Sequence, residues 1–208
     1  VKTLSGMFSG ATEFNQPIEN WDTSNVVNMA TMFHEFIDSD ATGGLVTHAT
    51  PRISGKFNQP IGNWDTSNVT NMMAMFFGAK FFNQNIGAWD TSNVTNMGSM
   101  FYMATAFDQD LSNWDVSSGV NFKYMFKGAD AFNQDLNDWD TSEVITMRAM
   151  FLSANEFNKN LDNLDTRKVT SMRDTFYGAA KFNNGAAAGV SNTLSWDVSK
   201  VTSTQSTF

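Results

Sequence analysis

The sequence predicts an α/β solenoid, a right-handed stack of about eight coils that each contain one short helix and one short strand. Two observations lead to this prediction. First, a Trp-Asp pair recurs every 25 residues along the middle of the chain, at Trp64, Trp89, Trp114 and Trp139. A fixed period of this length is the signature of a solenoid. Second, every period combines a segment with helical spacing of apolar residues and a segment rich in Asn, Asp, Gly and Pro.

The repeat divides residues 1–208 into units of a single domain. Five regular units of 25 residues span 57–181, and a longer unit with an 18-residue insertion covers 14–56. A partial unit covers 1–13, and a terminal unit with a 7-residue insertion covers 182–208. Because the chain lacks an initiator Met and begins within the pattern, we expect it to be a piece of a longer protein.

The second half of each unit is predicted to be helical. In one unit the apolar residues follow a helical spacing, at Val69, Met72, Met75, Phe76 and Ala79. The Asp-Thr-Ser-Asn stretch just before them suits a helix N-cap, because short side-chain oxygens accept hydrogen bonds from the first turn. Gly78 stands where such a helix should end.

The first half of each unit is predicted to form a short strand and a turn. Pro60, Gly62 and the many Asn and Asp residues argue against a helix there. A unit of about 25 residues with one short helix and one short strand is typical of a leucine-rich repeat, whereas a two-helix unit needs roughly 33 residues or more. One unit buries too little apolar surface to offset the entropy of ordering it, so the units must stack.

Two further positions of the unit are predicted to serve the stack. Eleven of the thirteen Met residues stand at the two Met positions of the helical half, so we expect them to fill the core. The Asn-Gln pair that follows the first Phe is predicted to form side-chain ladders, which would satisfy turn backbone between coils.

Composition excludes several classes of function. The chain carries 21 acidic and 13 basic residues, with a net charge of −8, which argues against nucleic-acid binding. It has no Cys, so disulfides and thiolate metal sites are absent. No apolar stretch is long enough to span a bilayer, and no phosphate-cradling Gly motif occurs.

The recurring string FNQxIxxWDTSxVTNMxxMFxxA resembles the BspA-like surface-protein repeat. This repeat is abundant in mycoplasma lipoproteins, occurs in other bacteria and some algae, and is usually grouped with bacterial leucine-rich repeats. Its function is largely unknown. The resemblance covers nearly the whole chain and implies a surface-exposed or secreted binding or adhesion module, without a catalytic residue to carry over. The chain departs from the pattern at Leu164, at Gly119 and in both insertions.

The Asp after each Trp is a candidate for cation binding. Neighbouring copies in a solenoid would lie near the strand spacing of roughly 5 Å, so something must offset their repulsion. The favoured interpretation is a helix N-cap, in which backbone N–H groups and the helix dipole stabilise the carboxylate. The alternative is a calcium ladder between coils, with carboxylate oxygens as ligands. Its ligands would come from Asp65, Asp90, Asp115 and Asp140.

The insertion between Phe33 and Phe57 is the longest non-repeated text. It contains both histidines and several acids: His34, Glu35, Asp38, Asp40 and His48. The stretch from Asp38 to Gly43 resembles the start of a calcium loop, but Ala49 stands where the loop needs a bidentate Glu. We expect a solvated loop, with a weak calcium site and a His-based transition-metal site as alternatives.

The position after each Met-Phe pair is not constrained by the core pattern. It is occupied by Ser9, His34, Phe77, Tyr102, Lys127, Leu152 and Tyr177. Stacked coils would align these side chains into a partly aromatic strip, which either packs under the neighbouring coil or grips a ligand. Phe81 and Tyr124 add rings at other variable positions. The candidate ligand-binding residues are Phe77, Tyr102, Tyr124, Leu152 and Tyr177.

These observations predict a non-enzymatic binding or adhesion scaffold, extracellular or on the cell surface, that recognises a protein or a glycan. The alternative is a structural spacer or self-assembling surface-layer element, in which the chain associates with itself. We expect no cofactor, with calcium as the alternative. A carbohydrate-active enzyme is disfavoured because a catalytic carboxylate pair should be unique, whereas these acids recur in every unit.

Overall fold

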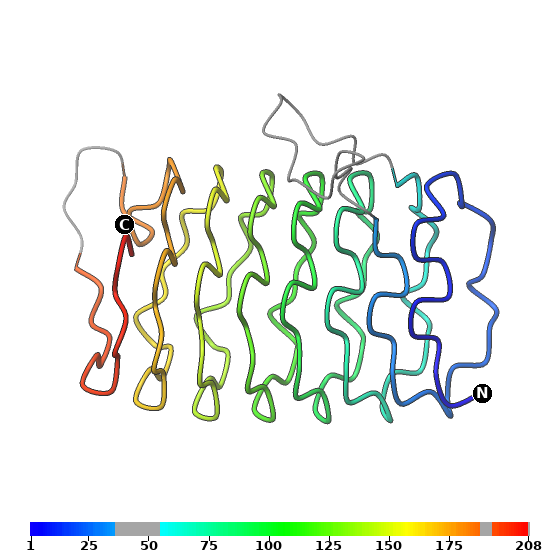
Figure 1. Cartoon of the computed structure of the whole chain (residues 1–208), viewed down its shortest axis with the longest axis horizontal. Coiled ribbons are helices and arrows are strands. Elements are labelled where there is room, and N and C mark those ends of the chain that lie inside the picture. Colours follow the sequence, from blue (N-terminus) through cyan, green and yellow to red (C-terminus); the bar gives the residue numbers. More distant parts are fainter. Residues whose placement is uncertain (36–54, 188–192, 208) are drawn as a thin grey trace, which may run out of the picture.

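The computed structural model describes residues 1–35, 55–187 and 193–207. The chain winds into a row of stacked coils, in which segments one repeat apart lie side by side (Figure 1). The N-terminus lies at one end of the row and the C-terminal coil at the other.

The described residues contain no α-helix, and their only strand-like pairing is a series of isolated parallel bridges. The predicted α/β solenoid with a helix and a strand in each coil is therefore wrong. One residue of each coil pairs with the equivalent residue of the next: Thr3, Asn28, Asn71, Asn96, Asn121, Thr146, Ser171 and Ser203. No helix in these parts of the chain is long and apolar enough to cross a membrane.

The bridge lies in the half of the unit that was predicted to be helical. Thr70 N–H donates to the Val27 carbonyl of the preceding coil at 2.9 Å, and Met72 N–H donates to the Asn96 carbonyl of the next coil at 3.0 Å. Asn71 between them is thereby paired on both sides. The half that was predicted to form a strand, around residues 57–64, contains no bridge.

After the bridge, successive backbone N–H groups donate in alternating directions. Ala74 and Phe76 donate to carbonyls of the next coil, both at 2.9 Å. Met75 and Phe77, which alternate with them, donate three residues back within their own coil, both at 3.2 Å. A helix would instead send every N–H four residues back along its own axis.

Backbone dihedral angles explain why no helix forms. The angle φ is positive at Ala74 (54°) and Gly78 (72°), and the same two positions are left-handed in the next coil at Ser99 (58°) and Met103 (54°). A right-handed helix cannot continue through left-handed residues. The apolar spacing therefore arises from tight turns that bring the chain back to the core after three or four residues, and Gly78 serves such a turn instead of ending a helix.

The core consists of columns of identical side chains that run along the stack. In one Phe column the ring centroids of Phe76, Phe101 and Phe126 are 5.7 and 5.5 Å apart. In the Trp column Trp89 and Trp114 are 6.4 Å apart, and each is only 3% exposed. Ten of the Met residues at the repeat positions are also buried, which confirms that they fill the core.

Polar groups at the edge of the core also bond from coil to coil. The Trp89 indole Nε1–H donates to the Ile61 carbonyl of the preceding coil at 3.0 Å. The buried Thr66 hydroxyl donates to the Asp90 carbonyl of the next coil at 2.9 Å. The predicted Asn-Gln ladder is confirmed, since the Asn58 side-chain oxygen accepts from the backbone N–H of the residue one repeat later and from the amide of the Gln beside it.

Val116 interrupts the ladder of buried hydroxyls, because it stands where the units on either side have Thr91 and Thr141. Thr91 donates to the Asp115 carbonyl at 2.8 Å and Thr141 to the Asp165 carbonyl at 2.9 Å. Val116 has no hydroxyl to offer the Asp140 carbonyl. Since Val and Thr have nearly the same shape, the two kinds of position form a matched pair for testing the value of this bond.

We expect Thr91→Val to lower the free energy of unfolding by about 1–2 kcal/mol, because it leaves a carbonyl without its donor. Val116→Thr should raise the free energy of unfolding by about 0.5–1 kcal/mol, because it supplies the missing donor. Urea denaturation of both variants measures these changes. Destabilisation by Val116→Thr as large as that by Thr91→Val would show that the ladder bonds contribute nothing.

Candidate functional site

The predicted strip is aligned on the surface of the stack. His34, Phe77 and Tyr102 form one column, with ring centroids 4.6 and 4.4 Å apart in stacked geometry. All three side chains are half-buried. The column arises because the Phe77 carbonyl accepts from the N–H of Glu35, which fixes neighbouring coils in register.

The strip continues along the stack, where its side chains become more exposed. Leu152 is half-buried, and Tyr177 is 55% exposed. Lys127, between Tyr102 and Leu152 in the same column, places its Nζ atom 4.9 Å from the centroid of the Tyr102 ring. This distance is within the range of a cation–π contact. The strip is therefore aromatic at one end, cationic in the middle and mixed at the other end.

Tyr124 lies beside the strip and is surrounded by cations. Its ring meets the Tyr102 ring edge-on at 6.3 Å. The Lys123 Nζ, Lys127 Nζ and Arg148 Cζ atoms are 4.8, 5.4 and 5.7 Å from the Tyr124 ring centroid. We call Lys123, Lys127 and Arg148 the basic cluster.

Sequence reasoning did not anticipate the basic cluster. Its signal was present, because Lys123, Arg148 and Arg173 occupy the same position of three consecutive units. Within a single unit, each is one cation with no other cation at its position. Only the stacking of coils turns the repeated position into a column of like charges.

Packing within the strip limits how it can contact a ligand. Phe77 lies between His34 and Tyr102, so both of its ring faces are covered by neighbouring rings. This leaves the ring edge for contact with a ligand, and an edge carries the positive part of the ring quadrupole. Phe77 therefore offers no open face on which a sugar ring could stack.

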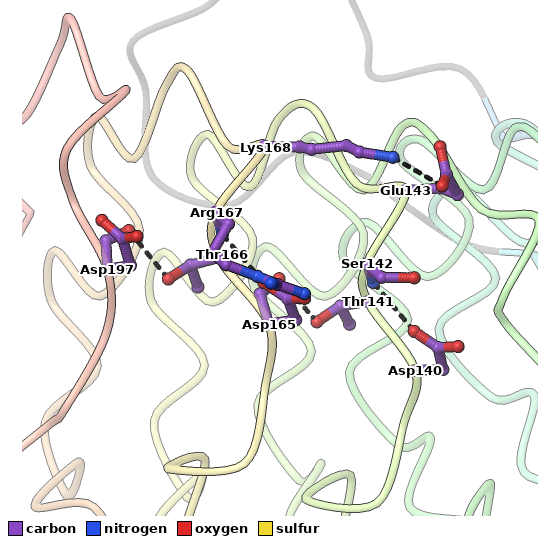
Figure 2. Close-up of polar contacts among 9 residues, drawn as sticks. All are labelled: Asp140, Thr141, Ser142, Glu143, Asp165, Thr166, Arg167, Lys168 and Asp197. Atoms are coloured by element: carbon purple, nitrogen blue, oxygen red, sulfur yellow. Dashed lines mark hydrogen bonds and ion pairs between the residues drawn. The ribbon is translucent and has the colours of Figure 1, made fainter.

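The repeated Asp residues form a second exposed column, which Figure 2 shows at Asp140, Asp165 and Asp197. Asp65 is typical: its Oδ1 atom accepts from the Ser67 backbone N–H at 3.0 Å and from the Ser67 hydroxyl at 2.6 Å. These bonds lower the pKa of the Asp65 carboxyl, with the side-chain bond as the larger cause. The predicted helix N-cap is wrong because no helix follows, although the carboxylate still accepts an N–H two residues ahead, now within a turn.

Asp165, the last but one member of the Asp column, differs because Arg167 stands where the other units have Ser (Figure 2). The Arg167 guanidinium donates to both oxygens of Asp165 and lowers the pKa of that carboxyl to about 2. In the adjacent column Lys168 and Glu143 form an ion pair between neighbouring coils.

The predicted calcium ligands fall into two groups. Asp38 and Asp40 lie outside the described residues, as does His48. Asp65, Asp90, Asp115 and Asp140 are exposed, and each accepts hydrogen bonds in its own turn. Within the described ranges no three His, Asp or Glu side chains are close enough to hold a metal ion. The calcium alternative stays a prediction.

Two residues at the start of the insertion are described. Burial lowers the pKa of His34 and raises the pKa of Glu35 to about 7. The Glu35 Oε2 atom is buried and makes no hydrogen bond in the described part of the chain. A neutral carboxyl group relieves the cost of that burial.

The surface also has hollows away from the strip. One, of about 280 Å³, is polar and lined in part by Asp110, Asp135, Asp138 and Lys159. Another, of about 490 Å³, is apolar and opens at the C-terminal coil beside Trp196. Neither includes a residue of the strip or of the basic cluster.

The repeated unit identifies the family. A family model described as "Mycoplasma protein of unknown function, DUF285" matches residues 1–41, 43–155, 80–188 and 133–208. The chain belongs to the DUF285 family. Comparison with curated proteins and with solved structures gave no match. The matched ranges overlap, as expected of a chain whose sequence repeats every 25 residues.

Acid should destabilise this DUF285 chain, because several carboxyl groups of the Asp column have lowered pKa values in the folded state. At Asp65, Asp115 and Asp140 bonds from Ser are the main cause, and at Asp165 the Arg167 guanidinium is. The unfolded state then binds more protons than the folded state below the ordinary Asp pKa of 3.8. This contribution to stability is complete above about pH 4 and is lost as pH falls through the folded values, down to about 2 at Asp165.

Thermal unfolding followed by circular dichroism at pH 7, 4, 3 and 2 measures this loss. We expect the melting temperature to fall mainly below pH 4. The variant Ser67→Ala/Ser117→Ala should show a smaller fall, because its Asp residues lose a hydrogen bond that favours the carboxylate. An equal fall in the variant would contradict the assigned cause.

Proposed function

We propose that the chain is a non-enzymatic binding scaffold, displayed outside the cell or on the cell surface, that recognises a protein or a glycan. Its binding surface is the strip together with Tyr124: Phe77, Tyr102, Tyr124, Leu152 and Tyr177. The observation that carries this proposal is the alignment of these variable side chains on neighbouring coils, at positions that the core does not use.

The contrast between recurrent and variable positions within the unit supports the proposal. The recurrent Phe, Trp, Met and Thr side chains are buried, and the recurrent Asp and Asn accept hydrogen bonds that hold turns and coils. These residues have structural roles in every unit. The strip position varies freely from unit to unit, and its side chains remain accessible, as Tyr177 does most clearly. Aromatic side chains on a rigid scaffold are typical of binding surfaces.

The surface location rests on the resemblance to BspA-like repeats of mycoplasma lipoproteins, which is finer than membership of DUF285. We propose that the chain is such a repeat region of a surface lipoprotein. A rigid stack suits this role because it holds a binding surface away from its attachment point.

Self-association in a spacer or surface layer is the second candidate. Ile145 (47% exposed) and Val27 (38% exposed) favour it, because they are apolar and occupy the same exposed column. That column also contains Thr70, Thr95 and Thr170, and successive members are joined by backbone hydrogen bonds. Two copies could pack these columns together laterally.

The double variant Phe77→Ala/Tyr102→Ala tests the binding function. If the strip binds ligand, attachment to a host-cell layer or to hits on a glycan and protein array should weaken by about tenfold or more. The matched control is Ile145→Ala, which removes an exposed apolar side chain elsewhere and should leave attachment unchanged. Binding is measured well below the melting temperature, because loss of two stacked rings also costs some stability.

Retained attachment in the double variant would contradict the proposal. Analytical sedimentation of the unmodified chain then tests the second candidate function, self-association in a spacer or surface layer. Concentration-dependent assembly that Ile145→Ala abolishes would support a spacer or surface-layer role, whereas a monomer at all concentrations would exclude it.

A further inference from the structure

The basic cluster is the one place in the described residues where several cations converge without acidic partners. The ion pairs in these residues engage other cations: Lys56, Arg167, Lys168, Arg173 and Lys181. Lys123, Lys127 and Arg148 form none of them. Such a concentration of positive charge is unexpected in a chain whose net charge is −8.

Arg148 shows most clearly that the cluster is incomplete. Its Nε atom is buried and has no hydrogen-bond partner among the described residues. A guanidinium N–H that loses water without gaining an acceptor is costly, and the acceptor it prefers is an anionic oxygen. The face of the Tyr124 ring stabilises part of the positive charge of the Arg148 guanidinium. It does not give the Nε–H an acceptor as strong as an anionic oxygen.

The cations are arranged along the stack. Lys123 and Lys127 belong to one coil and Arg148 to the next, where it occupies the position equivalent to Lys123. The same position in the following coil is Arg173, which pairs with Asp174 at 3.1 Å. Neighbouring coils lie near the strand spacing of about 4.8 Å, so the positive charge extends along the stack axis.

We propose that the basic cluster binds the sulfate or carboxylate groups of an acidic polysaccharide that lies along the stack. This inference rests on the proposed function and names the ligand of the same surface. The polymer would place one anionic group among Lys123, Lys127 and Arg148, and its hydroxyl groups would meet the hydroxyls of Tyr102 and Tyr124.

Two features favour a polysaccharide over an acidic peptide. Peptide ligands anchor through side chains that fill pockets, and the two hollows described above, beside Asp138 and beside Trp196, do not include the basic cluster. In addition, Lys123 and Arg148 occupy equivalent positions of neighbouring coils, which suits a polymer with regularly spaced anionic groups. Because the faces of Phe77 are covered, charge and hydrogen bonding, not stacking on a sugar ring, would supply most of the affinity.

The test compares two triple variants with the same change in net charge. Lys123→Gln/Lys127→Gln/Arg148→Gln removes the basic cluster, whereas Lys56→Gln/Lys168→Gln/Lys181→Gln removes three cations that are paired with Glu elsewhere. Affinity is measured by calorimetry for dextran sulfate, alginate, neutral dextran and polyglutamate at 50 and 200 mM NaCl. Melting temperatures establish that both variants are folded. If the first variant does not fold, Lys123→Ala and Lys127→Ala replace it singly.

We expect the unmodified chain to bind dextran sulfate or alginate, and the comparison of the two shows whether sulfate or carboxylate is preferred. Removal of the basic cluster should weaken this affinity by about tenfold or more and flatten its salt dependence. The paired-cation variant should change the affinity by less than about threefold.

Three results would overturn the inference: equal losses in both variants, no preference over neutral dextran, or tighter binding of polyglutamate. The last result would identify an acidic peptide as the ligand class. These outcomes are separable from failure of the proposed function. If Phe77→Ala/Tyr102→Ala abolishes cell attachment while loss of the basic cluster has no effect, the strip binds ligand without the charge contribution. If only the cluster matters, the aromatic strip is not the binding surface.

Discussion

The whole structure depends on how backbone hydrogen bonds are divided between one coil and the next. Beyond the single parallel bridge, alternate N–H groups leave the coil, as at Ala74 and Phe76, while those between them close turns within it. Each coil therefore satisfies only part of its own backbone, and the remainder requires a neighbour. A coil removed from the stack would lose these partners together with the packing of its Phe and Trp rings, so the stack is the smallest stable unit.

This division of bonds fixes the register, and the register turns every position of the unit into a column. Columns of Phe and Trp stack into a continuous core, because equivalent rings lie one coil apart. Columns on the surface bring like residues together whether or not that is favourable. Where charges meet, the chain alternates their sign, as in Glu143 and Lys168, or stabilises each charge by hydrogen bonds within its own turn, as in the Asp column. The cations of the basic cluster are stabilised in neither of these two ways. The cluster is therefore the part of the surface that points most clearly to a ligand.

From the sequence, the side chains that stacking buries or pairs could be predicted, whereas the backbone conformation could not. Burial of Met and Trp and the Asn-Gln ladder followed from the repeat itself and were confirmed. The helix was wrong because apolar residues at intervals of three and four also arise when tight turns return the chain to a core. The deciding property, a left-handed φ at two residues four positions apart in a coil, has only a weak sequence signal when its carriers are Ala74 or Ser99 instead of Gly. The basic cluster was missed because the sequence was read along units, whereas the charges gather across them.

The division of bonds between coils can be measured most directly by scalar couplings through hydrogen bonds in solution NMR. If alternate amides leave the coil, the amide nitrogen of Met72 should couple to the carbonyl carbon of Asn96, and that of Phe76 to the carbonyl carbon of Met100. The amide of Met75, between them, should couple to the carbonyl carbon of Met72. Couplings of successive amides to the carbonyl four residues earlier, without any coupling between residues one repeat apart, would show a helix and contradict the stack of turns described above.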